Sequence, residues 1–161
     1  MNRSTLDIWD ILADKPGGKW VFSRLLCFKA PYFGSIGPRF EALRPGFCQV
    51  AIRKRRAVLN HLGSVHAIAM CNMAELAGGT MMEVTVPPTH RWIPKGMTVQ
   101  YLEMAKSDLV ATATPRTRLD VSEANEFQVD VAVRDEHGQT VFAAAIAMWI
   151  TPRKDYLRAT R

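Results

Sequence analysis

The residues best suited to chemistry lie in the middle of the chain. Between residues 66 and 79 the sequence is almost wholly apolar, and its strongly polar side chains are His66, Asn72 and Glu75. A carboxylate in apolar surroundings either acquires a partner or stays poised to accept a proton. Glu75 is therefore a candidate general base, and a structural acid held by backbone amides or an arginine is the alternative. Asn72 is predicted to be structural.

The segment that begins at His66 is predicted to be a helix. Ala, Met, Leu and Glu favour that state, and the Gly78-Gly79 pair is expected to end it. A helix that is apolar on nearly every side is typically buried, and this one falls short of the roughly 20 residues that cross a bilayer. We expect a sheet to wrap around the helix and to bury Glu75.

The spacing of His66 and Glu75 has a geometric consequence. Nine residues of helix correspond to a rotation of about 180° and a rise of roughly 13 Å, so one chain does not bring both to one carbonyl group. A two-fold partner would place its Glu75 opposite this chain's helix N-terminus. Free amides and the positive end of the helix dipole suit a developing oxyanion there.

The remaining segments predict one curled antiparallel sheet around this helix, an α+β arrangement. Alternating apolar patterns and Pro or Gly breaks indicate strands at 47–56, 80–86, 97–104, 109–114, 127–134 and 140–151, with a loop at 90–96. Ser4 is expected to cap a first helix with Asp7, a second helix is expected at 20–28, and 30–45 is expected to be irregular with one helical turn.

The chain is expected to be one domain over residues 1–161. Residues 1–45 form a helical lead-in, 46–151 the core and 152–161 a basic tail. Open sheet edges and a helix covered on one side predict a homodimer or a dimer of dimers.

Composition narrows the functional classes. The 161 residues are 48% hydrophobic and 22% charged, which is typical of a globular protein. The three cysteines form no CxxC motif and are odd in number, and no signal peptide or transmembrane run is present, so we expect a cytoplasmic protein. No His/Cys cluster indicates a metal, and no Ser-His-Asp arrangement indicates a serine nucleophile.

The net charge of +6 is concentrated in Arg53–Arg56 and the C-terminal tail. No zinc-finger, helix-turn-helix or aromatic RNP-type pattern accompanies these residues, so nucleic-acid binding is not expected. The block at Arg53–Arg56 either is solvated surface or binds the phosphates of a coenzyme A carrier.

One motif resembles a known family. Asn60-x-x-Gly63-Ser64-x-His66-Ala67 followed by Glu75 resembles the N-x-x-G-T-x-H-G-G…D/E signature of hotdog-fold acyl-CoA thioesterases. The segments 92–97 and 101–102 add a likeness to an uncharacterised hotdog subfamily, a domain of unknown function. The likeness covers about residues 45 to 151. It implies the hotdog fold, in which an antiparallel sheet of about six strands wraps a long central helix.

The resemblance also implies roles for individual residues. The Ala67 amide would bind the thioester oxygen, Glu75 would activate water, and Asn60 would position that water, while His66 belongs to the same catalytic motif. Structural alternatives remain open: Asn60 as a turn residue, His66 as a core or interface histidine and Ser64 as a helix cap. Ala67-Ile68 replaces the Gly-Gly pair that is frequent in the family. The Ile68 side chain is expected to narrow the path by which a ligand reaches the helix. The residues expected to bind substrate are Gly63, Ser64, Ile68, Tyr101, Arg53 and Arg55.

The predicted function is hydrolysis of an acyl-CoA or acyl-carrier thioester by a homodimer, without a cofactor. Two alternatives stay open. A hotdog dehydratase or hydratase also pairs a histidine with a helix acid. A non-catalytic acyl or lipid binder would use Glu75 structurally and line an apolar slot with methionines such as Met70 and Met73.

Overall fold

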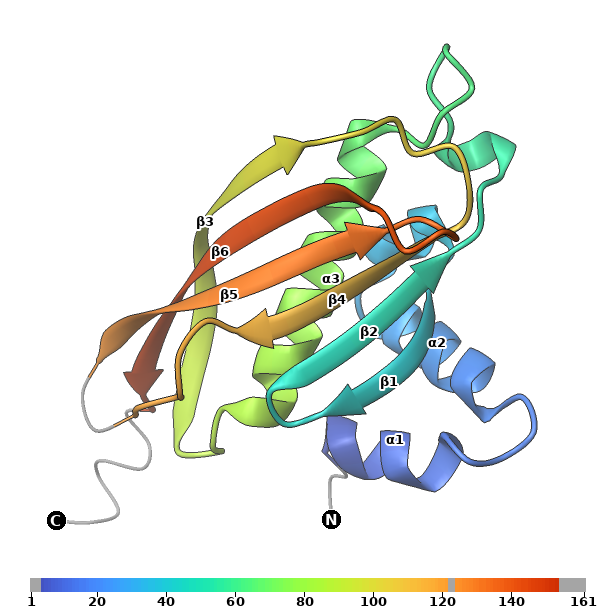
Figure 1. The fold of residues 1–161 in the computed structure, drawn as a ribbon. Helices are drawn as coiled ribbons and strands as arrows, with labels where there is room; N and C mark the ends of the chain where they lie inside the picture. Colours follow the sequence, from blue (N-terminus) through green and yellow to red (C-terminus); the bar gives the residue numbers. More distant parts are fainter. Residues whose placement is uncertain (1–3, 122–123, 154–161) are drawn as a thin grey trace, which may run out of the picture.

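A six-stranded antiparallel sheet curls around one long helix within residues 4–121 and 124–153, the part of the chain described in the computed structural model (Figure 1). The helical segments are α1 (Thr5–Leu12), α2 (Gly18–Lys29), η1 (Pro31–Ile36), η2 (Arg56–Val58) and α3 (Ala67–Thr85). The strands are β1 (Arg39–Arg44), β2 (Phe47–Ile52), β3 (His90–Tyr101), β4 (Leu109–Pro115), β5 (Asn125–Arg134) and β6 (Thr140–Pro152). This is the hotdog fold that the sequence predicts.

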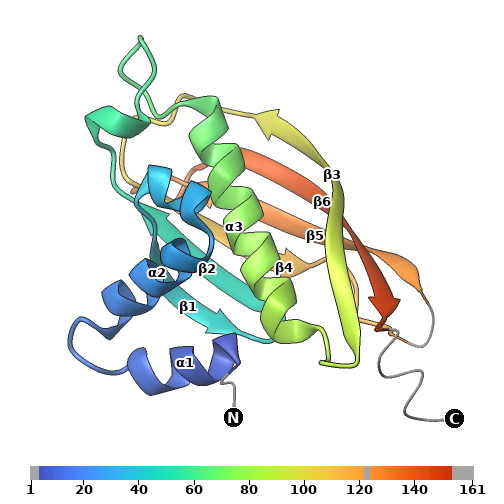
Figure 2. The ribbon, with the colours of Figure 1, turned by 180° about the vertical axis from the view of Figure 1, so that it is seen from behind.

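The strand order places α3 across one face of the sheet. The order is β1-β2-β4-β5-β6-β3, so β3 crosses over to pair with β6 at the far edge. Seen from behind, α2 lies beside α3 on the β1 side, and β3 runs along the opposite side (Figure 2). The helical lead-in and β3 therefore flank the same helix from two sides.

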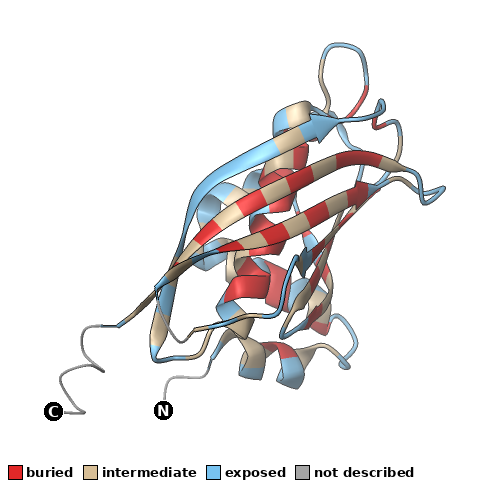
Figure 3. Cartoon of the chain, turned by 60° about the vertical axis from the view of Figure 1, so that its left-hand side comes forward, coloured by how far each residue is buried: buried red, intermediate tan, exposed pale blue. Residues whose placement is uncertain are grey.

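The core lies between α3 and the sheet. Alternate residues of β5 and β6 are buried, as are the residues of α3 that face them (Figure 3). Val129, Val131 and Val133 share the buried side of β5, as their spacing predicts. Successive side chains of a β-strand point to opposite faces of the sheet, so the spacing of apolar residues in the sequence identifies the buried face.

The first helix begins as expected. Ser4 Oγ accepts a hydrogen bond from the Asp7 amide at 3.1 Å, and the Asp7 carboxylate accepts one from the Ser4 amide at 2.9 Å. This reciprocal pair satisfies backbone donors at the helix start.

The strand predicted at 80–86 is wrong, because α3 continues through Gly78 and Gly79 to Thr85. Both glycines lie where α3 approaches the sheet. A Cβ atom on Gly78 would stand 2.8 Å from Ile146 Cδ1, and one on Gly79 would stand 3.2 Å from Trp92 Cη2. The glycines therefore allow close packing and do not end the helix.

Other boundaries also differ from the prediction. The strand expected at 47–56 ends at Ile52. Residues 90–96, expected as a loop, form the first half of β3, whose register shifts between Pro94 and Gly96. An edge strand with such an irregularity tolerates proline. The strand expected at 97–104 ends at Tyr101. The connection expected at 30–45 contains η1 and β1, so the lead-in also contributes a strand to the sheet. Residues 154–161 of the expected basic tail lie outside the described residues.

The packing of Gly78 predicts a stability effect. Val at this position should lower the free energy of unfolding by about 1–3 kcal/mol, because its branches would be forced against the buried Ile146 side chain. Urea unfolding measures the change. Glu83→Val, at an exposed position of the same helix, is the matched control and should change stability by less than about 0.5 kcal/mol. Equal stability of the two variants would contradict a packing role for Gly78.

Candidate functional site

The N-terminus of α3 is organised by His66. Its Nδ1 accepts a hydrogen bond from the Ile68 amide at 3.1 Å, and its carbonyl accepts bonds from the Ala69 and Met70 amides. A neutral imidazole that accepts at Nδ1 carries its proton on Nε2. The helix thus begins where the sequence predicts, but His66 is the cap and Ser64 is not.

Among the first amides of α3, that of Ala67 has no acceptor within the described residues. Amides in the first turn of an α-helix have no intrahelical partner and carry the positive end of the helix dipole. The Ala67 N–H is therefore free to donate to a ligand oxygen. Ile68 follows it in the chain and is 55% exposed.

Asn60 holds the loop that leads into α3. Its Oδ1 accepts from the Leu62 amide at 2.9 Å and the Ser64 amide at 3.2 Å, and its Nδ2 donates to Ser64 Oγ at 2.9 Å. Gly63 has a φ of +77°, which suits glycine at this turn. These contacts match the alternative in which Asn60 is a turn residue, because both lone pairs of Oδ1 are used within the loop.

Glu75 lies on an open face of α3. The expectation that it is buried is wrong for the single chain, because the side chain is exposed. It borders a pocket of about 360 Å³, called here the apolar pocket. The walls are mainly apolar and come from the lead-in, α3 and the β3–β6 pair; they include Leu26, Phe33, Trp92 and Met148. The carboxylate thus stands at the rim of an apolar space large enough for part of a ligand.

A second, smaller pocket lies at the beginning of the same helix. It has a volume of about 190 Å³ and is called here the N-terminal pocket. His66, Ile68 and Asn72 line it from the start of α3, and residues of η1 and η2 border it on the other side. Ile68 and Glu75 are seven residues apart, so they lie within about 20° of each other around α3. The two pockets therefore follow one another along one side of the helix.

Tyr101 approaches α3 from the end of β3. Its hydroxyl lies 3.4 Å from Cys71 Sγ, and this hydrogen bond raises the pKa of Tyr101. The tyrosine is 53% exposed and borders neither of the two pockets.

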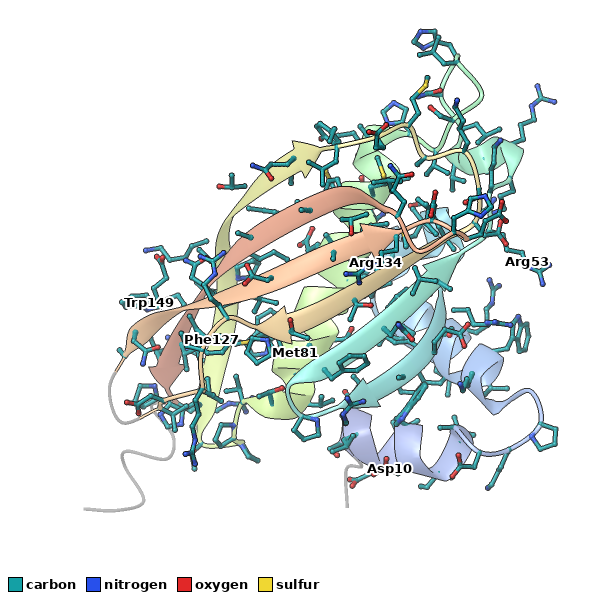
Figure 4. All side chains as sticks on the ribbon, in the orientation of Figure 1. Asp10, Arg53, Met81, Phe127, Arg134 and Trp149 are labelled. Atoms are coloured by element: carbon teal, nitrogen blue, oxygen red, sulfur yellow. The ribbon has the colours of Figure 1, made fainter. Side chains whose placement is uncertain are left out.

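The predicted phosphate-binding arginines lie elsewhere. Arg53 stands just beyond the end of β2 (Figure 4), and Arg55 Nη2 donates to the Ser35 carbonyl at 3.0 Å. Both border a groove of about 770 Å³ that also contains Glu41 and Asp108. The groove is distinct from the pockets along α3, and acidic side chains offset part of its positive charge.

The described residues contain no group of three His, Cys, Asp or Glu side chains placed to hold a metal ion. In that same part of the chain, no helix combines the length and apolarity needed to cross a membrane.

Sequence reasoning missed the pocket walls contributed by Leu26, Phe33 and Trp92. It also missed the pairing of Asn72 with Ser35, whose side chains are hydrogen-bonded at 3.2 Å. These two residues are 37 positions apart, so no local pattern signals the contact.

Comparisons with known proteins agree with this architecture. The family model described as "Domain of unknown function (DUF4442)" matches residues 18–150. A crystallised structural-genomics protein shares 40% identity over 92% of this chain and 98% of its own, with a TM-score of 0.79. A protein from Pseudomonas aeruginosa, described as of unknown function and a probable thioesterase, shares 25% identity over 81% of this chain and 93% of its own, with a TM-score of 0.71.

A more distant structure shows the same fold. A thioesterase from Haemophilus influenzae shares 14% identity over 80% of this chain and 87% of its own, with a TM-score of 0.70. No curated protein matches the chain.

The contacts of Asn60 predict that it acts mainly on the loop. Asn60→Ala should lower the free energy of unfolding by about 1–2 kcal/mol, because it leaves the Leu62 and Ser64 amides without their acceptor. Asn60→Asp keeps that acceptor, so its free energy of unfolding should fall by less than that of Asn60→Ala. His61→Ala, at an exposed position of the same loop, is the control. Unchanged urea unfolding of Asn60→Ala with a large loss of turnover would instead favour the water-positioning role.

Proposed function

Because the chain belongs to the family described as "Domain of unknown function (DUF4442)" and shares its fold with proteins named thioesterases, we propose that it hydrolyses acyl thioesters. The observation that carries the proposal is the Glu75 carboxylate at the rim of the apolar pocket. An acid placed between water and an apolar slot suits general-base attack on an acyl group bound in that slot.

The chemistry follows from two groups on α3. Glu75 takes a proton from water, and the water oxygen forms a bond to the thioester carbon. The carbonyl electron pair moves to oxygen, and the Ala67 N–H donates to that oxyanion. Collapse of this intermediate restores the carbonyl and breaks the carbon–sulfur bond. The thiolate leaves and takes the proton from Glu75, so acid and thiol are the products.

The two groups belong to different subunits in this proposal. Ala67 and Glu75 are eight residues apart, about 12 Å along α3, so one chain does not bring both to one carbonyl. A two-fold partner supplies the second group by placing its α3 against this one. The site is then shared across a homodimer, and each dimer has two sites.

The free edge of β3 supports that assembly. Within the described sheet β3 pairs with β6 alone, and its outer side is exposed over most of its 12 residues. Ile93 and Tyr101 are 55% and 53% exposed. A long exposed edge that carries apolar side chains and unpaired amides and carbonyls favours pairing with another strand. Pairing β3 with its copy would extend the sheet and bring the open faces of the two α3 helices together.

Non-catalytic acyl binding is the second candidate. The exposed Ile68 side chain beside the Ala67 amide favours it, because a bulky group there restricts the approach of a thioester carbonyl. Substrate turnover distinguishes the two candidates.

Glu75→Gln should reduce thioester hydrolysis about 100-fold or more, because the amide cannot accept the proton of water. Thiol release from a panel of acyl-CoA substrates measures this. Glu83→Gln is the matched control, since Glu83 is also exposed on α3 and borders the same pocket. Full activity of Glu75→Gln would refute the general-base role.

The same panel separates the other activities. Tight acyl binding without thiol release by the wild-type protein would favour the binder. Hydration of an enoyl-CoA without thiol release would favour a hydratase.

Ala67→Pro tests the shared site. Proline is well tolerated at the first position of a helix, and it replaces the amide hydrogen there with a ring carbon, so the fold should persist while hydrolysis falls. Refolding equal amounts of inactive Ala67→Pro and Glu75→Gln chains together should restore about a quarter of wild-type activity, because half of the dimers then hold one intact site. No recovery in verified heterodimers would contradict a site built from two subunits.

A further inference from the structure

The N-terminal pocket contains a buried polar group that the proposed mechanism does not use. The floor of the pocket is formed by the buried residues Ile36, Val58, Ala69 and Asn72. Asn72 is 6% exposed, and its Nδ2 donates to Ser35 Oγ at 3.2 Å. Its Oδ1 is buried and has no hydrogen-bond partner among the described residues.

Such an atom is informative because buried polar groups are nearly always hydrogen-bonded. The contrast with Asn60 is direct, since the Oδ1 of Asn60 accepts two bonds within its own loop. Within the described residues, Asn72 therefore has a buried amide oxygen that still lacks a donor. It needs an N–H or O–H donor that enters the pocket.

The rim of the pocket offers complementary groups. His66 accepts through Nδ1, so its Nε2 carries a proton that can be donated, and the Ser35 hydroxyl is a further donor. Ala67, with its free amide, lies between His66 and Ile68, which both border the pocket. Donors at the rim and one acceptor at the floor match a secondary amide, which presents a carbonyl and an N–H together.

The position and size of the pocket identify which part of a ligand fits. Its volume of about 190 Å³ accommodates a short segment and is too small for a whole coenzyme. A thioester whose carbonyl binds the Ala67 amide would place its thiol portion beside this pocket. In coenzyme A and in carrier-protein arms alike, the thiol portion carries a secondary amide two carbons from sulfur.

We propose that the N-terminal pocket binds the amide of the thiol portion of the substrate, with Asn72 Oδ1 accepting from its N–H. The inference rests on the proposed function and makes Asn72 a specificity-determining residue. Thioesters of simple alkyl thiols would lack this contact. Coenzyme A and carrier-protein thioesters would share it, because both contain the same segment.

Binding of non-hydrolysable analogues tests the contact without requiring turnover. The probes are an acyl thioether of N-acetylcysteamine and its isostere in which an ester oxygen replaces the amide N–H. The wild-type protein should bind the amide about tenfold more tightly than the ester, as expected for one hydrogen bond to a buried acceptor. For Asn72→Ala, calorimetry should give nearly equal affinities for the amide and the ester probes. Asn72→Asp keeps an acceptor and should retain the preference.

Hydrolysis of the matching thioesters gives a second readout. A recognition role predicts that Asn72→Ala lowers kcat/KM for the amide substrate and leaves the ester substrate nearly unchanged. Acyl-CoA and acyl-carrier-protein substrates should lose activity by the same factor if both use the shared amide. A loss confined to one of them would assign the pocket to that carrier.

Equal binding of amide and ester by the wild-type protein would overturn the inference, as would an equal loss for both probes in Asn72→Ala. The proposed function fails differently, through absence of thiol release from every thioester. The affinities for the two thioether probes are measured without turnover. The proposed amide contact and the proposed hydrolysis can therefore each fail while the other holds.

Discussion

The contact between α3 and the sheet is the constraint on which the rest of this structure depends. Gly78 lets the helix approach so closely that a Cβ atom there would collide with Ile146, and Met73 and Met81 of the same helix have no exposed surface. Interiors packed this closely leave a helix little freedom to slide or rotate. The position of the amides at the helix N-terminus and the direction of Glu75 both follow from that contact.

The two sides of α3 therefore differ in their structural environment. The side that meets β2, β4 and β5 stabilises the fold, while the side that carries Ile68 and Glu75 remains open in the single chain. Two structures border that open side, the helical lead-in and β3, and together they supply the walls of the apolar pocket. An exposed strand edge beside an open helix face is an arrangement that a second copy of the chain would complete.

Two asparagines show how tertiary contacts assign roles that residue type does not. Asn60 lies in the motif and uses its side chain to hold a turn. Asn72 lies in the apolar helix beside the N-terminal pocket, and its Oδ1 has no hydrogen-bond partner among the residues that the structure describes. The motif correctly identified the region of the helix N-terminus. The two side chains differ in their hydrogen bonds: Asn60 Oδ1 accepts two, whereas Asn72 Oδ1 accepts none from the described residues.

The sequence by itself determined the features that depend on local spacing. It identified the helix start at His66, the buried face of β5 and a sheet curled around one helix, because residue preference and side-chain periodicity are properties of neighbouring residues. The hotdog fold followed from the resemblance of the Asn60–Glu75 motif to a known family. The tertiary structure alone decided that Gly78-Gly79 continues the helix, that β3 begins at His90 and that Glu75 is exposed. It also joined Ser35 to Asn72. These features depend on contacts between segments that are distant in the sequence, and local sequence patterns do not predict such contacts.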